Sequence, residues 1–207
     1  MDLSVFSVLD NFNRANEGPP ANGWTTIFGS GFKVLSNQAA TDGVSGDNGG
    51  WYTQQKYGPD CAVYVTIVAA AATYGDLQVR ATGTSSATAC AYDFGMQAAN
   101  NTLGFYRADN GAFTQLGASI SQTITNGDSW GGTVIGNTLT MHYKTAAGSW
   151  QVMGTRTDST YTASGYLGMS FNSTTQAYDN FGGGTIGNAA FRPTKTRPRP
   201  FAPGLGR

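Results

Sequence analysis

Charged side chains are scarce in this sequence. Lys, Arg, Asp and Glu make up 12% of its 207 residues, about half of the share in an ordinary globular domain. No stretch repeats apolar residues every 3.6 positions between helix caps, so a helical protein with a charged surface is excluded. Glycine is abundant, at 29 residues, and together with many Thr, Ser and Asn it favours short strands joined by tight turns.

Residues typical of catalytic and metal sites are also few. The chain has one glutamate, Glu17, one histidine, His142, and two cysteines. Glycoside hydrolysis needs two carboxyl groups facing each other across the scissile bond, yet no predicted strand carries two carboxylates at positions i and i+2 or i+4. We therefore expect no catalytic residue and no enzymatic activity. Strand alternation places His142 outward beside Lys144, as a solvated surface histidine.

The two cysteines, Cys61 and Cys90, lie in apolar, strand-like segments. Buried free thiols are the expected state, and a disulfide is the alternative. Long apolar runs are absent, since the longest, residues 62–72, is too short to span a membrane. The first ten residues have no positively charged region and no small-residue cleavage site, so we expect no signal peptide. These features predict synthesis in the cytoplasm without membrane insertion.

Several segments show the two-residue alternation of a half-buried strand. Residues 61–68 and 139–144 are the clearest, with apolar side chains at every second position. The other predicted strands are residues 24–28, 32–35, 77–81, 89–96, 103–107, 113–116, 150–153 and 166–171. Asn-Gly pairs at 110–111 and 126–127, and breaks at 135–137 and 146–148, predict turns between them. About a dozen short strands in one domain predict an all-β sandwich of two antiparallel sheets.

Two Asp-Asn-Phe triplets bracket this pattern, at residues 10–12 and 179–181. We predict that residues 10–14 pair antiparallel with residues 178–181, as the end strands of one domain, residues 1–186. The composition then changes. Residues 187–207 contain four prolines and five basic residues without an acid, so this segment carries +5 and the remainder −5. Proline excludes a helix here and favours an extended C-terminal arm.

The chain resembles the concanavalin A-like (laminin G and glucanase) jelly roll in its end motifs. These are Leu9-Asp10-Asn11-Phe12-Asn13-Arg14, then Gly23-Trp24, and the closing Tyr178-Asp179-Asn180-Phe181. With Arg199-Pro200-Phe201-Ala202-Pro203-Gly204 near the end, it is similar to minor tail proteins of bacteriophages that infect actinobacteria. The resemblance covers almost the whole chain. It implies a jelly-roll sandwich with neighbouring end strands, in a structural protein of a virion.

Sugar binding is a further implication of this fold. An aromatic ring can stack on a sugar ring while Asp and Asn bind its hydroxyl groups. The candidate ligand-binding residues are Asp47, Asn48, Trp51, Tyr52, Asp128 and Trp130. The alternative for each Trp is packing in the core or a loop. Host cell-wall glycan is the ligand that the resemblance suggests.

Calcium is the one cofactor that the resemblance suggests, because many proteins of this fold hold it near the terminal strands. Asp10 and Asp179 are the candidate ligands, with Asn side chains and backbone oxygens completing six or more. The alternative is that both residues end or cap the edges of paired strands.

The arm is expected to anchor the protein to other virion proteins and to copies of itself. Arg192, Arg197 and Arg199 can pair with acidic groups, and Phe201 and Leu205 can fill apolar pockets. Nucleic acid is not an expected partner, because the interleaved aromatic residues of a single-strand binder are absent. The sequence thus predicts a minor tail protein at the tail tip. A capsid decoration protein, and a free lectin or glycan hydrolase, are the alternatives.

Overall fold

The computed structural model describes residues 1–41, 46–70 and 73–187. Strands account for 56% of the residues, and they form two eight-stranded sheets. Every described strand pairing is antiparallel. The predicted all-β sandwich is therefore confirmed. The predicted arm, apart from Gly187, lies outside the described residues, and so do all five of its predicted anchoring residues.

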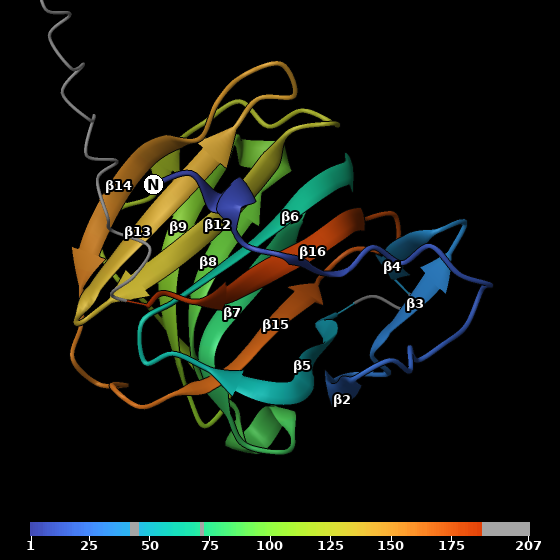
Figure 1. Cartoon of the computed structure of the whole chain (residues 1–207), viewed down its shortest axis with the longest axis horizontal. Helices are drawn as coiled ribbons and strands as arrows, with labels where there is room; N and C mark the ends of the chain where they lie inside the picture. Colours follow the sequence, from blue (N-terminus) through green and yellow to red (C-terminus); the bar gives the residue numbers. More distant parts are fainter. Residues whose placement is uncertain (42–45, 71–72, 188–207) are drawn as a thin grey trace, which may run out of the picture.

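We call the two layers the front sheet and the back sheet, because Figure 1 looks onto the first with the second behind it. The front sheet runs in the order β14-β13-β12-β6-β16-β4-β3, with β1 paired to β16. Its strands are β1 (Val8–Asp10), β3 (Phe32–Leu35), β4 (Gln38–Thr41), β6 (Cys61–Ala69), β12 (Ser129–Ile135), β13 (Thr138–Lys144), β14 (Gln151–Thr157) and β16 (Ala177–Thr185).

The back sheet runs in the order β10-β9-β8-β7-β15-β5-β2, with β11 paired to β9. Its strands are β2 (Trp24–Phe28), β5 (Asn48–Tyr57), β7 (Tyr74–Thr82), β8 (Cys90–Gln97), β9 (Thr102–Asp109), β10 (Ala112–Gln115), β11 (Ile120–Ser121) and β15 (Gly165–Phe171). Three three-residue 3-10 turns are the only helical elements described, η1 (Leu3–Val5), η2 (Ser86–Thr88) and η3 (Ala98–Asn100). Within the described ranges no helix has the length and apolar character needed to cross a membrane.

The two ends of the domain lie side by side, as the paired triplets predict. β1 pairs antiparallel with β16, and Asp10 lies opposite Phe181. The pairing ends at Asp10 because Phe12 has a φ of 52°, which turns the chain away from the sheet. The Phe12 backbone N–H donates to Asp10 Oδ1 at 2.8 Å. The first triplet is thus the end of a strand and the turn that follows it.

The main core fills the space between the sheets. The predicted inward faces of residues 61–68 and 139–144 are confirmed, since their alternate side chains lie in this cluster. Trp24 is in the core as expected, with ring centroids of Phe32 and Phe181 each 4.8 Å away. Both cysteines are free thiols, Cys61 buried and Cys90 partly exposed, so the disulfide alternative is wrong.

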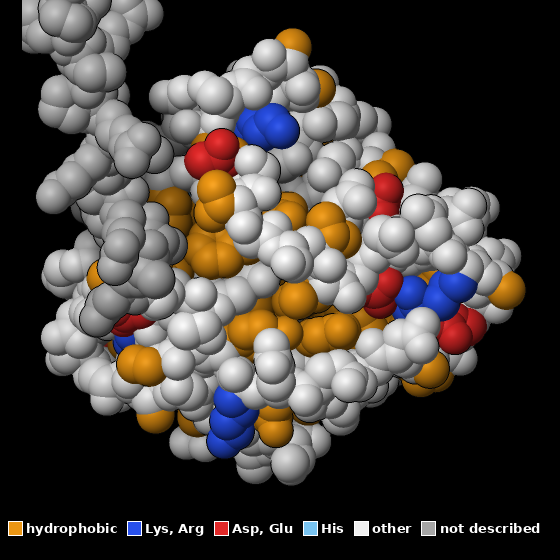
Figure 2. Space-filling view, in the orientation of Figure 1, with side chains coloured by type: hydrophobic (Ala, Val, Ile, Leu, Met, Phe, Trp, Pro, Cys, Tyr) orange, Lys and Arg blue, Asp and Glu red, His pale blue; other side chains and the backbone are white. Residues whose placement is uncertain are grey.

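A second, smaller apolar cluster covers the outer face of the front sheet. The N-terminal segment crosses this face in Figure 1 and buries Leu3 completely against Ala62 and Tyr64. An ideal Cβ on Gly131 would lie 2.7 Å from Leu3 Cδ1, so only glycine at this position of β12 leaves room for the leucine. The Tyr64 hydroxyl donates to the Phe6 carbonyl at 3.0 Å and fixes the end of the segment. Figure 2 shows hydrophobic side chains across the middle of the same face.

This covering segment makes the prediction for His142 wrong. The residue does lie on the outer face of β13, but it is only 1% exposed. Its Nε2 lies 3.3 Å from the hydroxyl of Thr133. Burial, together with the positive charge of the N-terminal amine, lowers the pKa of His142 to about 4. A neutral, buried imidazole is what results.

Candidate functional site

A pocket of about 320 Å³ opens on the outer face of the back sheet. Strand β7 contributes Tyr74 and Asp76 to it, whereas Leu77 and Val79 on the opposite face of β7 lie in the core. The two-residue period of the strand therefore sends one face into the core and the other toward the pocket. The complete lining is Asp47, Tyr74, Asp76, Tyr106, Phe113, Gln115 and Asn172.

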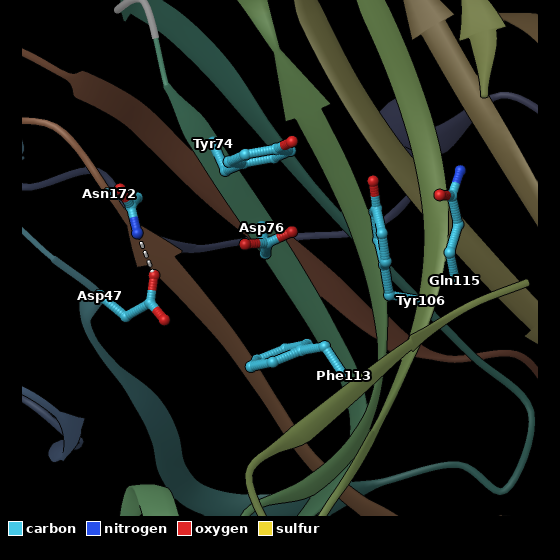
Figure 3. A pocket seen from close by; sticks show the side chains of 7 residues that line it. All are labelled: Asp47, Tyr74, Asp76, Tyr106, Phe113, Gln115 and Asn172. Carbon is cyan, nitrogen blue, oxygen red and sulfur yellow. Dashed lines mark hydrogen bonds between the residues drawn. The ribbon is translucent and has the colours of Figure 1, made fainter.

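Aromatic rings surround a carboxyl group in this pocket. In Figure 3, Asp76 lies between the rings of Tyr74 and Phe113, and Tyr106 closes a third side. Tyr74 is 43% exposed and Phe113 is 48% exposed. Rings that remain this accessible beside polar groups are available to a ligand.

Glycines on the floor of the pocket determine how Tyr106 lies. Tyr106 on β9 pairs with Asp93 on β8, and its ring leans along the sheet over Gly95 and Gly104. An ideal Cβ would come within 2.7 Å of this ring at Gly95 and 2.8 Å at Gly104. Any larger residue at either position would displace the ring and change the shape of the pocket.

Three carboxyl groups belong to this face of the sheet. Register places Asp93 opposite Gln78, two residues along β7 from Asp76, so the Asp76 and Asp93 side chains share a face. Asp76 Oδ2 accepts a long hydrogen bond of 3.5 Å from Ser170. Asp47 is exposed at the rim, where its Oδ1 accepts from the Asn172 amide at 2.5 Å.

Burial favours the protonated form of the two carboxyls on the pocket floor, Asp76 and Asp93. Burial raises the pKa of Asp76 well above its usual range, and the negative charges of Asp93 and Asp47 raise it further. Burial also raises the pKa of Asp93, to about 7, with Asp47 adding to the shift. Asp93 is 1% exposed, and neither of its oxygens has a hydrogen-bond partner within the described structure.

Three solved structures have folds similar to this one. The carbohydrate-binding module CBM66 from Bacillus subtilis matches with a TM-score of 0.60 and 17% identity, over 78% of this chain and 95% of its own. The β-glucanase of Bacillus licheniformis matches with a TM-score of 0.53 and 14% identity, over 86% and 96%. The exoplasmic/lumenal domain of VIP36, in its Ca²⁺/Man-bound form, matches with a TM-score of 0.53 and 12% identity, over 77% and 80%. No family model and no curated protein matches the sequence.

The chain has a concanavalin A-like jelly-roll fold. The resemblance in the end motifs is thus confirmed at the level of the fold, and the pocket lies on the outer face of one sheet of this jelly roll.

The two tryptophans predicted to stack on a sugar cannot do so, because both are fully buried. Trp51 packs in a small cluster with Phe28 and Tyr166 on the back sheet. Trp130 lies between the sheets, where its indole N–H donates to the Phe94 carbonyl at 3.3 Å. The prediction is wrong for these two residues, and the alternative of packing holds.

The other four predicted ligand residues lie at different places in the structure. Asp47 lines the pocket. Asn48 is buried, and its amide donates to the Gly46 carbonyl at 2.9 Å. Asp128 is buried, and its Oδ2 accepts from the Tyr143 hydroxyl at 2.7 Å. Tyr52 lies on β5 and lines a different hollow, together with Asp10 and Arg14. Of the six, only Asp47 is at the candidate site.

The predicted calcium ligands do not fit a cation. Asp10 Oδ1 accepts from the backbone N–H of Phe12 at 2.8 Å and from the Arg14 guanidinium at 2.7 Å. Asp10 Oδ2 accepts from the Trp24 indole at 2.9 Å. Asp179 accepts only from the neighbouring backbone N–H, and burial raises its pKa. Asp10 therefore already faces a cation and two N–H donors, which supports the alternative of a structural role at the strand ends.

Six of the seven lining residues were missed from the sequence: Tyr74, Asp76, Tyr106, Phe113, Gln115 and Asn172. One available signal was the aspartate in the middle of each of two alternating strands, at Asp76 and Asp93, because Asp is depleted in strands. The carboxyl groups meet across neighbouring strands, so a search along each strand separately does not find them. Among the described residues, no group of three His, Cys, Asp or Glu side chains could hold a metal ion.

Proposed function

We propose that this protein is a non-enzymatic, glycan-binding structural protein of a bacteriophage virion, positioned at the tail tip. The observation that carries the binding function is the pocket of the back sheet. Its exposed rings, Tyr74 and Phe113, flank the acceptor Asp76. Ring faces can stack on the C–H face of a sugar while carboxylate and amide groups bind its hydroxyls. The similar folds of a carbohydrate-binding module and a β-glucanase support the same ligand class.

We propose binding without hydrolysis, because one of the three carboxyl groups of this face is buried and Asp47 already accepts a hydrogen bond from the Asn172 amide. Glycoside hydrolysis requires two carboxyls at the scissile bond. A sugar in the pocket can reach Asp76, but Asp93 is 1% exposed and lies beneath the surface that the sugar would touch. The chain therefore presents one floor carboxyl to a ligand, together with Asp47 at the rim.

The virion role is supported by the end motifs and by the charge distribution. Residues 10–14 and 199–204 resemble the corresponding segments of actinobacteriophage minor tail proteins, and residues 187–207 carry +5 against −5 for the rest of the chain. A basic, proline-rich arm suits attachment to acidic neighbouring subunits. Capsid decoration would use the same arm, whereas a free lectin would have no use for it.

Glycan binding is tested by titrating the protein with tetramers of β-1,4-linked glucose, N-acetylglucosamine and glucosamine, and with arabinogalactan. Phe113→Ala should weaken binding of the preferred glycan by about tenfold or more, because it removes an exposed ring face. Val152→Ala is the matched control, since Val152 is also exposed but lies on β14 of the front sheet, and it should bind as the wild type does.

The same samples should release no reducing sugar from glucan or arabinogalactan. Absence of binding to every glycan, or equal effects of Phe113→Ala and Val152→Ala, would contradict the proposal. Reducing-sugar release that Asp76→Asn abolishes in a folded protein would make the protein a hydrolase.

A further inference from the structure

The carboxyl groups of the pocket have no basic partner within the described structure. Five carboxylates elsewhere on the domain pair with arginine: Asp10 and Glu17 with Arg14, Asp60 with Arg80, and Asp109 and Asp158 with Arg107. No ion pair within the described structure involves Asp47, Asp76 or Asp93, and no Lys or Arg is among the described lining residues. A ligand that supplies positive charge would complete the site.

The surroundings of Asp76 suit an organic cation better than a metal ion. The Tyr74 and Phe113 rings lie on opposite sides of Asp76 and Tyr106 lies on a third. The faces of such rings attract ammonium groups that come within about 6 Å of the ring centre. In contrast, the carboxyls of this face do not converge into a set of three that could bind a metal.

We propose that this pocket selects glycans carrying a free, protonated amino group, such as glucosamine oligomers, over neutral or N-acetylated ones. This inference rests on the proposed glycan-binding function and names its substrate class. An ammonium group has three hydrogen-bond donors, which Asp76 and Asp47 can accept while the surrounding rings contact the sugar. An N-acetyl group in the same place would offer one amide donor and no charge.

Asp93, which is buried beneath the pocket, also favours a ligand with a positive charge. Burial disfavours the ionised form of Asp93, and the amide of Gln78, opposite it on β7, favours that form. A cation bound above the floor would favour ionisation of Asp76 and Asp93. Since burial raises the pKa of both groups, binding of a sugar whose amino group is already protonated should release a proton to the solvent, and binding of a neutral sugar should not.

The test uses three β-1,4-linked tetramers that differ only at C2 of each sugar: glucosamine, N-acetylglucosamine and glucose. Affinity and proton release are measured by calorimetry in buffers of different ionisation enthalpy. We expect the glucosamine tetramer to bind about tenfold or more tightly than the glucose tetramer. Asp76→Asn should bring the glucosamine tetramer to the affinity of the glucose tetramer and abolish proton release. Asp47→Asn, at the exposed rim, should reduce the same preference and serves if Asp76→Asn does not fold.

Asp2→Asn is the matched control, because it changes the net charge by the same amount at an exposed position on the opposite face. It should leave the preference unchanged, and asparagine remains a good cap for η1. Equal or tighter binding of the glucose or N-acetylglucosamine tetramer would overturn the inference and leave the glycan-binding function standing. An equal loss in Asp2→Asn and Asp76→Asn would also overturn it, as unspecific charge attraction. If no tetramer binds and Phe113→Ala changes nothing, the proposed function fails together with the inference.

Discussion

Asp93 links the stability of this jelly roll to pH through a single buried carboxyl. Burial raises its pKa from 3.8 to about 7. A group whose pKa is higher in the folded state stabilises the fold below its unfolded pKa, and this contribution is lost as the pH rises through the folded value. The native protein should therefore lose stability between about pH 4 and pH 7 through this group.

Asp93→Asn should reduce this dependence, and Asp76, whose pKa is also raised by burial, should keep its own part of it. The variant should equal the wild type near pH 4 and become the more stable of the two as the pH rises, by at most about 1.4 kcal/mol per pH unit. Urea unfolding followed by tryptophan fluorescence at several pH values measures the difference. His142 acts with the opposite sign over about pH 4 to 6.5, because burial lowers its pKa to about 4, but it is present in both proteins and cancels. Unfolding curves that stay parallel at every pH would refute the assignment.

Single residues were the hardest feature to predict from the sequence. Trp51 and Trp130 follow polar loop-like segments, a pattern typical of an exposed sugar platform, yet both lie in strands whose neighbours cover them. Conversely, Asp76 and Phe113 come from strands well separated in sequence and meet only through the sheet order. A contact between residues on such strands can be predicted from the sequence only when the strand pairing is known.

At the scale of elements, the alternation of apolar and polar residues predicted the strands correctly where the side chains are large. The predicted strands at 24–28 and 32–35 match β2 and β3 in full. β5 and β12 were not predicted as strands, because Gly49-Gly50 and Gly131-Gly132 interrupt their apolar pattern. These glycines have packing roles, since an ideal Cβ on Gly132 would lie 2.3 Å from the Phe94 ring. A glycine pair that is typical of a turn in the sequence here allows a close approach between the two sheets.

The N-terminal segment is an element whose role can be measured. Leu3 is fully buried over the front sheet, so Leu3→Ala should destabilise the fold by about 2–3 kcal/mol. It should also open the cover of His142 and move the pKa of that histidine upward toward its ordinary value, because burial is what lowers it. Chemical denaturation gives the first quantity and NMR titration of the only histidine gives the second.

Val5→Ala is the control for this variant, because Val5 lies in the same turn and is 69% exposed. It should change stability by no more than about 0.5 kcal/mol. If Leu3→Ala and Val5→Ala behave alike, and the His142 titration does not move, the segment does not act as a cover.

At the scale of the whole molecule, the two triplets were the most informative part of the sequence. They predict the contact between β1 and β16, which joins segments about as far apart as the chain allows. The predicted arm follows from a change of composition, and its proposed role is attachment. The last described strand, β16, ends at Thr185, and Ile186 packs against Leu3, Ala62 and Tyr64 on the outer face of the front sheet.

Truncation after Gly187 should therefore leave a folded, soluble domain that no longer enters phage particles. An extended, proline-rich segment loses little conformational entropy when it binds, so residues 188–207 can attach the domain with a modest contact area. Two further variants of the full chain separate the contributions of the arm. Replacing Arg192, Arg197 and Arg199 by Gln removes the charge and keeps the apolar anchors. Phe201→Ala with Leu205→Ala removes the apolar anchors and keeps the charge. Quantitative analysis of purified particles gives the occupancy of each variant, and circular dichroism checks that each domain is folded. Normal occupancy of the truncated protein would show that the jelly roll itself carries the attachment surface.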